Sequence, residues 1–401
     1  MYRWFFLSLT LLLPLELLGQ ETVIPSAGRA AQIQEESQEK ARQLASESPP
    51  ASDNSLRNLG KLIHFVPIHF GVEGLGPGAG PAIHSRLLQE TDGGHLALRL
   101  WGRLAIHEFY TAGAGLEFKT ASPYNATFAL EGSHSDLPQL EYYGPGPDSS
   151  IHNRTDFRRE DTLFNLRAAV HTGHALAACR VGELLLNVGT GTNDKLASTQ
   201  SVFGPDQAPG IAVQSNYLIP GCSAQIDLRD FPEDPHKGTF VAATFDRYFA
   251  QNQTRFSFSR PSIMAEQYIP FFNGKRVIAL RARTELSFHS DNQVVPFYLQ
   301  STLGSDTDLR GFRRYRFYDE NSIALTAEYR WEIATGLNMA LFVDGGNVFH
   351  RPDQFSLAQM EGSAGFGLRF ISQSDRKMLA RLDMGFSREG FRVWLKVPEL
   401  F

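Results

Sequence analysis

Long runs of strict alternation between apolar and polar side chains are the feature that most constrains the fold of this chain. In VIALRARTELSFHS (277–290), aliphatic side chains alternate with arginine, glutamate and serine. The same pattern recurs in NSIALTAEYRWEI (321–333) and GLNMALFVDGG (336–346), and in 95–106, 162–170, 363–370 and 376–386. A period of two residues is typical of a β-strand whose two faces meet different surroundings, so these runs predict an all-β fold.

The length of the runs separates a membrane barrel from a soluble sandwich. Strands of soluble proteins usually span about 5 to 6 residues, whereas a tilted strand that crosses a bilayer needs roughly 9 to 11. The apolar faces also tend to end in aromatic residues, such as Tyr329 and Trp331 or Phe386 and Phe391, as in the aromatic girdles of membrane barrels. The pattern therefore predicts a transmembrane antiparallel β-barrel with charged side chains facing a wet lumen.

Composition agrees with this fold although it first suggests a soluble protein. Hydrophobic residues make up 42% of the 401 residues, and the mean hydropathy is -0.24. A bundle of membrane helices is excluded, since each span needs about 20 mainly apolar residues, but a barrel averages its two faces. The formal net charge of -5 argues against nucleic acid as a partner, because phosphate binding calls for a basic excess.

The chain divides into three predicted parts. Residues 1–19 carry Arg3 and then a nearly continuous apolar stretch, the pattern of a secretory signal peptide; the alternative is a membrane anchor, but Pro14 and Glu16 interrupt the stretch. Residues 20–59 are polar and are predicted to form a periplasmic linker. Residues 60–401 are predicted to form the barrel, with about 16 strands at roughly 20 residues per strand and connection.

The connections alternate in length. Short ones are expected at 106–110, 228–238, 272–275, 334–336 and 388–390, and longer ones at 138–157, 189–216, 288–319 and 347–359. Membrane barrels carry short turns on the periplasmic side and long loops outside, so we expect the short connections to share the periplasmic end.

Within one long loop lies Leu309-Arg310-Gly311-Phe312, followed by a strand with Glu328 and another with Asp344. This combination resembles the bacterial surface antigen family of the BamA/TamA type, which are outer-membrane barrels of assembly and translocation. The resemblance implies that the loop folds into the lumen and that Arg310 meets Glu328 and Asp344. The alternation independently places both carboxylates on the lumen face, and an arginine fork suits such a pair. The alternative is a set of ordinary solvated lumen charges.

Two further segments resemble the same family. Asp227, Arg229, Asp230 and Pro232, with Gly238 after them, look like the family's periplasmic turn ahead of a central strand. The final strand resembles the C-terminal signal that the barrel assembly machinery reads, through Phe391, Val393, Leu395, Val397 and Phe401.

The resemblance implies a role in outer-membrane protein assembly or translocation, in contact with outer-membrane lipids. Residues 20–59 are too few for a separate folded domain such as the family's periplasmic POTRA domain, so the resemblance implies that a separate periplasmic partner protein would have to supply that function. The alternatives are a passive pore for small solutes and a barrel-embedded lipid hydrolase; no nucleophile motif is present, so we expect no enzyme.

No cofactor or metal is expected, and two cysteines cannot build a four-thiolate site. Cys179 and Cys222 could lie on neighbouring strands of an exported protein, where a disulfide is permitted. Our estimate of the strand pairing sets them several residues out of register, which predicts two free thiols.

Overall fold

The computed structural model describes residues 68–74, 81–90, 95–106, 108–120, 125–272, 274–372 and 376–397. The predicted signal peptide (1–19), the linker (20–59) and Phe401 lie outside the described residues. No helix in these ranges is long and apolar enough to span a membrane.

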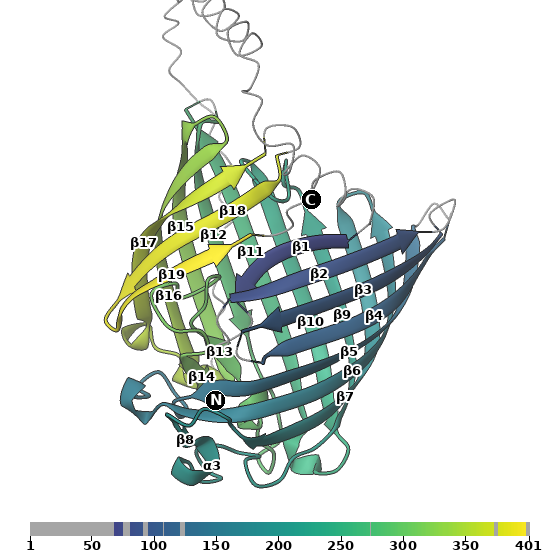
Figure 1. Cartoon of the computed structure of the whole chain (residues 1–401), viewed down its shortest axis with the longest axis vertical. Coiled ribbons are helices and arrows are strands. Elements are labelled where there is room, and N and C mark those ends of the chain that lie inside the picture. Colours follow the sequence, from purple (N-terminus) through teal and green to yellow (C-terminus); the bar gives the residue numbers. More distant parts are fainter. Residues whose placement is uncertain are drawn as a thin grey trace, which may run out of the picture. The chain divides into compact units, whose positions relative to one another are not determined.

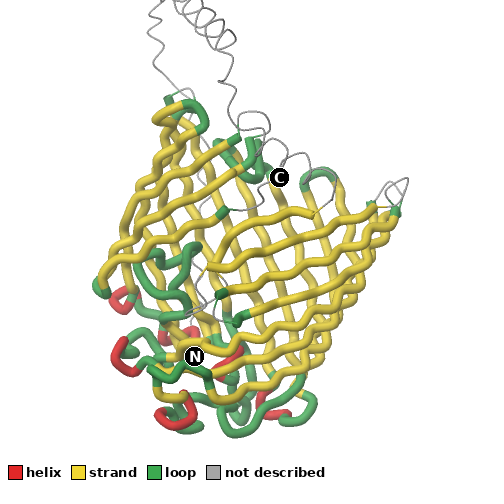
Figure 2. Tube along the Cα trace, in the orientation of Figure 1, coloured by secondary structure: helices red, strands yellow, loops and turns green. Residues whose placement is uncertain are grey.

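An antiparallel sheet curls into a barrel (Figure 1, Figure 2). Within the described ranges the main sheet holds 17 strands, and all except the two-residue β8, which pairs in parallel with β6, form the wall. The prediction of an all-β barrel of about 16 strands is confirmed. The wall strands are β1 (Ile68–Gly74), β2 (Pro81–Glu90), β3 (Leu96–Ala105), β4 (Tyr110–Lys119), β5 (Ala126–Tyr142), β6 (Thr155–Thr172), β7 (Ala175–Thr190), β9 (Tyr217–Asp227), β10 (Gly238–Ala250), β11 (Phe258–Phe271), β12 (Arg276–Glu285), β15 (Asn321–Ala334), β16 (Leu337–Phe349), β17 (Glu361–Ile371), β18 (Met378–Ser387) and β19 (Gly390–Lys396).

The remaining elements are short and belong to the loops. They are β8 (Ala197–Ser198), α3 (Thr199–Val202), β13 (Ser301–Leu303), β14 (Phe317–Asp319) and the 3₁₀ turns η1 (Ile151–Asn153), η2 (Thr254–Phe256), η3 (Phe297–Leu299), η4 (Pro352–Gln354) and η5 (Leu357–Gln359). Strands β13 and β14 pair with each other as a separate two-stranded sheet.

The alternation seen in the sequence separates the two faces of the wall. On β16, Leu341 and Val343 are 47% and 57% exposed, whereas Phe342 and Asp344 are 3% and 4% exposed. Apolar side chains on an outer surface suit lipid contact, and the alternate positions face a lumen that loops partly fill. The transmembrane barrel inferred from period two is therefore the observed fold.

The two ends of the barrel differ in their connections. Loops 143–154, 191–216, 286–320 and 350–360 lie at one end, here called the long-loop end, and turns such as 228–237 and 335–336 lie at the other, the short-turn end. The expectation that the short connections share one end is wrong for 106–110 and 388–390. Tyr110 pairs with Asp136, in the part of β5 that leads into loop 143–154, and Phe386 pairs with Ala364, near the start of β17. The turns at 106–110 and 388–390 therefore lie at the long-loop end. Strand direction decides the end, and a tight hairpin can form at either one.

A buried aromatic cluster closes the long-loop end of the lumen between β5 and β10. Phe297, from the loop 286–320, is fully buried and contacts Tyr142 of β5 and Phe157 of β6, with ring centroids 5.1 and 4.9 Å apart. The same cluster includes Phe256 and Phe258. Aromatic burial of this size provides much of the packing that holds the loops over the barrel.

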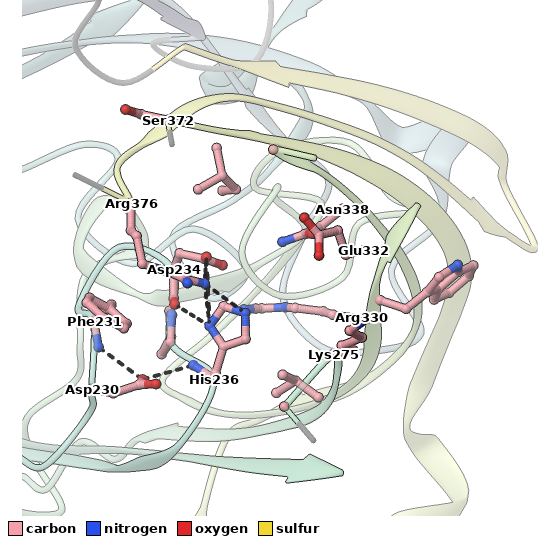
Figure 3. Close-up of a pocket in the computed structure, with 16 residues that line it drawn as sticks. Asp230, Phe231, Asp234, His236, Lys275, Arg330, Glu332, Asn338, Ser372 and Arg376 are labelled. Atoms are coloured by element: carbon pink, nitrogen blue, oxygen red, sulfur yellow. Dashed lines mark hydrogen bonds and ion pairs between the residues drawn. The ribbon is translucent and has the colours of Figure 1, made fainter. Parts of the chain in front are cut away.

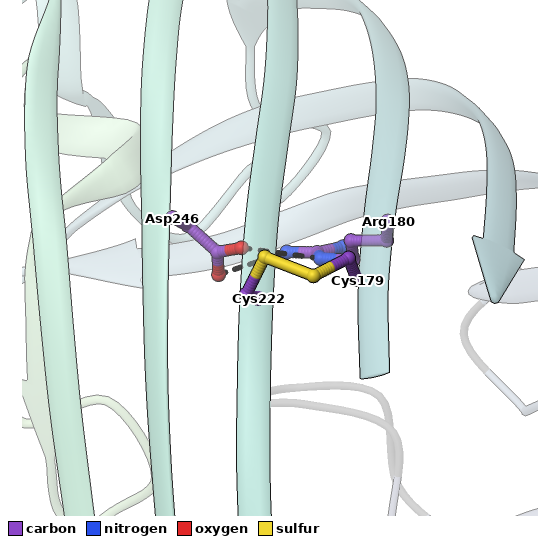
Figure 4. The surroundings of a disulfide bond; sticks show 4 residues. All are labelled: Cys179, Arg180, Cys222 and Asp246. Atoms are coloured by element: carbon purple, nitrogen blue, oxygen red, sulfur yellow. Dashed lines mark hydrogen bonds and ion pairs between the residues drawn. A yellow bond between two sulfur atoms is a disulfide. The ribbon is translucent and has the colours of Figure 1, made fainter. Parts of the chain in front are cut away.

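Cys179 and Cys222 form a disulfide, so the prediction of two free thiols is wrong (Figure 4). The two residues are direct partners in the β7–β9 register, and both are exposed on the outer face. On the lumen side of the same strands, Arg180 of β7 reaches Asp246 of β10 at 2.9 Å, across the bare backbone of Gly221. The long loop 191–216 does not fix how far β9 slides along β7. The observed register pairs Arg180 with Asp246 in the lumen and places Cys179 opposite Cys222.

The first and last strands meet at a seam with little pairing. Strand β1 pairs with β2 along its whole length, and β18 pairs with β19 from Arg381 to Ser387. Between β1 and β19, within the described ranges, a single bridge joins Val72 and Val397, whose backbone N–H groups donate to each other's carbonyls at 3.1 and 3.0 Å. The barrel is therefore closed, but weakly at this one junction.

Candidate functional site

Residues 286–320 enter the lumen from the long-loop end and pack against the inner wall of β15–β19. We call this segment the lumen loop. Leu309, Phe312 and Phe317 of the loop form a buried cluster with Ala324 of β15 and Val348 of β16. Phe312 is fully buried and meets Phe317 edge-on, with centroids 5.1 Å apart. The loop thus carries an apolar base of its own that seats it on the wall.

At the loop tip, Arg310 contacts both carboxylates that the sequence singled out. Its Nη1 lies 2.8 Å from Glu328 Oε2, and its Nη2 and Nε lie 2.7 and 3.1 Å from the two oxygens of Asp344. The backbone N–H of Arg310 also donates to Asp344 at 3.2 Å. Only 2% of Arg310 is exposed, and its guanidinium stacks on the Phe342 ring at 3.3 Å. The loop is therefore fastened by a bidentate fork, a neighbouring carboxylate and an aromatic face.

Sequence reasoning missed the outer part of this ion network. Asp383 of β18 is fully buried and lies 3.6 Å from Arg310, while Arg369 of β17 contacts both Asp383 and Glu328. Arg330 and Arg381 complete the network, each bonded to a carboxylate at 2.7 Å. The alternation along β17 and β18 was the available signal, because it places Arg369 and Asp383 on the lumen face.

Gly311 is needed because the loop backbone touches the wall. A Cβ at this position would lie 2.7 Å from the carbonyl of Phe386 and 2.8 Å from Ser363 Cβ. Any side chain at residue 311 would push the loop away from β18 and stretch the Arg310 contacts.

The lumen loop is also tied to the hairpin beside the seam, which sequence reasoning did not foresee. The indole N–H of Trp394 on β19 donates to the carbonyl of Arg310 at 2.7 Å, and the Ser387 hydroxyl donates to the carbonyl of Gly311 at 2.8 Å. Arg316, 1% exposed, reaches Glu389 in the β18–β19 turn at 2.8 Å. One edge of the seam is therefore held to the loop by three polar contacts.

The predicted turn motif lies between β9 and β10 at the short-turn end. Arg229 bridges Asp227 at 2.7 Å and Glu266 of β11 at 3.2 Å. Gly238 has φ of 113°, and a Cβ there would collide with the carbonyl of Leu228. Pro232 lies exposed in the turn. The motif thus ties the start of β10 to its neighbours.

Asp230 shapes the same turn by accepting backbone hydrogen bonds. The N–H groups of Phe231, His236 and Lys237 donate to its Oδ1 at 3.0, 2.9 and 3.2 Å. Burial alone would raise the pKa of Asp230, but these donors outweigh it and hold that pKa below its usual range. The carboxylate is therefore charged wherever the turn is folded near neutral pH.

The β9–β10 turn reaches toward the β17–β18 turn (Figure 3). Arg376 Nη2 lies 2.9 Å from Asp234 Oδ2, and the Arg376 guanidinium stacks on Phe231 at 4.7 Å. A cavity of about 370 Å³ lies beside this contact, with Lys275, Arg330 and Glu332 among its lining residues. The turns of two distant strand pairs therefore share one polar cavity.

The C-terminal strand presents the expected alternation. Phe391, Val393 and Leu395 are 57%, 52% and 55% exposed on the outer face, and Val397 forms the seam bridge. In the ranges that the structure covers, no group of three or more His, Cys, Asp or Glu side chains is placed to hold a metal ion.

Residues 215–374 match the Omp85 superfamily domain. The chain carries an Omp85 domain. The match includes the β9–β10 turn, the lumen loop and the strands of both Arg310 partners, and the predicted kinship with BamA/TamA-type barrels is confirmed at superfamily level. An Omp85 barrel is an outer-membrane barrel, so the predicted location is confirmed as well.

Solved structures show the same fold at low sequence identity. BamA from Haemophilus ducreyi lacking POTRA domains 1–3 aligns with a TM-score of 0.63 and 13% identity, covering 82% of this chain and 69% of that one. CdiB from Escherichia coli (TM-score 0.55, 13% identity) and CdiB from Acinetobacter baumannii (0.51, 12%) also match over 82% of this chain. The chain spans 62% and 59% of the length of those two structures. No curated protein sequence matches the chain significantly.

Proposed function

We propose that this Omp85 barrel acts on other polypeptides in the outer membrane, in their assembly or translocation, and that its working element is the seam between β1 and β19. The observation that carries the proposal is the single Val72–Val397 bridge at that seam in the described ranges. A net contribution of about 0.5 to 1.5 kcal/mol per hydrogen bond makes two such bonds much easier to separate than a full ladder.

The lumen loop supports the same role by giving the seam one firm edge. Trp394, Ser387 and Glu389 on the β18–β19 hairpin all contact the loop. When the seam opens, β19 is expected to stay with the loop and the wall, while β1 moves. An edge of unpaired backbone groups would then be available to pair with an incoming strand.

A cross-linking experiment tests this proposal. Cysteines at Val72 and Val397 should lock the seam upon oxidation, with Cys179 and Cys222 kept in their disulfide. Full-length protein in liposomes is given a urea-unfolded eight-stranded barrel as the client, and protease protection reports insertion. We expect the oxidised variant to lose the stimulation that the wild type provides, and the same variant before oxidation of its two new cysteines to retain it.

The matched control locks a junction that is already paired. Leu382 and Leu395 are direct partners on β18 and β19, and both are exposed on the outer face. Oxidised L382C/L395C should retain the stimulation. Equal activity of the locked seam and the locked control would overturn the proposal, and so would a wild type without any stimulation of client insertion or passage.

The passive pore is the second candidate, and a cavity of about 540 Å³ in the lumen beside β3–β6, lined by Arg99, Lys119 and Arg167 among others, favours it. The buried aromatic cluster at the long-loop end opposes it, because Phe297 and its neighbours close that side. We expect planar bilayers to show a mostly closed conductance. A steady large conductance in the wild type would favour the passive pore over a role in assembly or translocation. We propose no enzymatic activity, and phospholipase and esterase assays on purified protein should give no turnover.

A further inference from the structure

A cavity of about 540 Å³ opens in the lumen at the short-turn end of β3–β6. Arg99 lies near the start of β3, Lys119 ends β4, and Arg167 lies near the end of β6, so all three belong to this end of the wall. Thr127 of β5 and Ala169 of β6, which are direct partners in register, form part of the lining between the charged side chains. We call this site the basic chamber.

Positive charge exceeds negative charge in the basic chamber. Glu117 is the one carboxylate among the described lining residues, 7% exposed, and it is in contact with Arg99 and 3.7 Å from Lys119. Arg167 makes no ion pair or hydrogen bond with any residue that the structure describes. Arg99 and Lys119 face Glu117, and Arg167 adds a positive charge that no described carboxylate meets. The low-dielectric wall of a barrel concentrates the field of that charge.

The register explains why Arg167 is left without a carboxylate. Ala129 stands between Glu117 and Arg167 in one row across β4, β5 and β6, and the next residue in that row is Arg180 of β7. Arg180 is already engaged by Asp246 at 2.9 Å. Small side chains thus make room at the point where the unpaired guanidinium projects.

We propose that the basic chamber is a binding site for a phosphate group. An arginine fork matches two phosphate oxygens, a lysine adds a point charge, and the Thr127 hydroxyl can donate to a third oxygen. The phosphate can belong to a lipid headgroup or to a soluble phosphorylated solute that enters from the short-turn end. The proposal is independent of the seam, since β3–β6 are fully paired strands.

Calorimetric titration of the full chain in a phosphate-free non-ionic detergent tests the proposal. One arm uses inorganic phosphate and glycerol 3-phosphate, and the other uses short-chain phosphatidylglycerol. Binding in the first arm identifies a soluble source, and binding in the second arm alone identifies a headgroup. Chloride at equal ionic strength should compete weakly in either case, because it lacks the oxygen geometry that the fork fits.

Variants assign the binding to the chamber. Arg167→Gln and Lys119→Gln should each weaken binding by about tenfold or more, as expected for loss of a charge-assisted contact. Arg388→Gln is the matched control, because it removes one positive charge from an exposed pair with Glu361 at the opposite end; its binding should be unchanged. Equal effects of all three variants, or no binding in either arm, would overturn the proposal.

A measurement on the wild type covers the case in which a variant does not fold. Bound phosphate should protect Lys119 from amine acylation, whereas exposed Lys275, in the other polar cavity, should react at an unchanged rate. Equal protection of both lysines, or of neither, would contradict a site in the basic chamber.

Discussion

Two parts of the lumen wall treat charge in opposite ways. Around Arg310, on β15–β18, each arginine of the network meets a carboxylate, and the lumen loop covers them. On β3–β6, Arg99 and Lys119 share Glu117, and Arg167 has no carboxylate among the described residues. Buried charge must be matched because desolvation is costly, whereas a water-filled chamber tolerates an excess. The paired charges of the first region therefore stabilise the barrel, whereas the excess charge of the second is available to bind a ligand.

The largest effect is expected from Arg310→Ala in the matched region. Loss of one partner leaves buried Glu328 and Asp344 without their shared cation, and such losses cost about 3 to 5 kcal/mol. Urea titration and heat-modifiable gel mobility should show a strongly destabilised barrel. Arg388→Ala, which breaks an exposed pair, should change the urea midpoint little; equal effects of the two variants would contradict the assignment of Arg310 as the loop anchor.

The next largest effect is expected from loss of the disulfide that joins β9 to β7, the strand beside the basic chamber. Cys179 and Cys222 are 43 residues apart in the chain. A cross-link of that span lowers the entropy of the unfolded chain and stabilises the folded protein by about 2 to 4 kcal/mol. The double variant C179S/C222S should therefore unfold at lower urea concentration. Wild-type protein under reducing conditions should shift in parallel, and an unshifted midpoint would show that β7 and β9 are held by other contacts.

Trp394→Phe removes the indole donor but keeps the aromatic ring on β19. The carbonyl of Arg310 then loses one partner, which should cost about 1 kcal/mol. Protease cleavage of the lumen loop should become faster, and client stimulation should change if the loop steadies the seam. Trp331→Phe is the matched control on β15, because the Trp331 indole makes no hydrogen bond with any described residue. Equal cleavage of both variants would argue against the link.

Arg167→Ala sharpens the contrast with Arg310, because the same residue type is removed from the open region. No buried carboxylate loses its partner, and repulsion with Arg180, its direct register partner, is relieved. The urea midpoint should stay within about 0.5 kcal/mol of wild type. A loss approaching that of Arg310→Ala would mean that the chamber is a structural site.

The smallest effect concerns pH at the long-loop end. A hydrogen bond with Asp319, opposed by burial and aided by Glu320, raises the pKa of His350 above its usual value. A raised pKa means that this stabilisation is complete below the unfolded-state pKa and is lost as pH rises through the folded-state value. His350→Gln should therefore lower the urea midpoint slightly near pH 5.5 and leave it unchanged above pH 8. Urea unfolding at both pH values measures this difference. A larger difference at high pH would reverse the assigned sign. Since His350 is half-exposed, solvent keeps the effect small.

Local pattern predicted the barrel and the faces of its strands well. Period two in 321–333 and 336–346 placed Glu328 and Asp344 on the lumen side, where the structure has them buried. The family resemblance then led to Arg310, and the structure brings the three side chains together. These features were predictable because alternation is a property of neighbouring residues in one strand.

Pairing between strands was harder to predict. Cys179 and Cys222 were set out of register, the turns at 106–110 and 388–390 were assigned to the wrong end, and Trp394 was not recognised as a partner of the loop. Each of these depends on how far one strand slides along another, and a long loop such as 191–216 leaves that offset open.

The sequence by itself determined that this chain forms a membrane barrel with charged residues on its lumen face, because period two, strand length and apolar outer faces are all local properties. Only the tertiary structure decided which of those charges meet. Register and closure place Asp383 beside Arg310 and keep Glu117 two strands away from Arg167. Charge pairing depends on distances of a few ångströms between strands far apart in the chain, and those distances exist only after the barrel has closed.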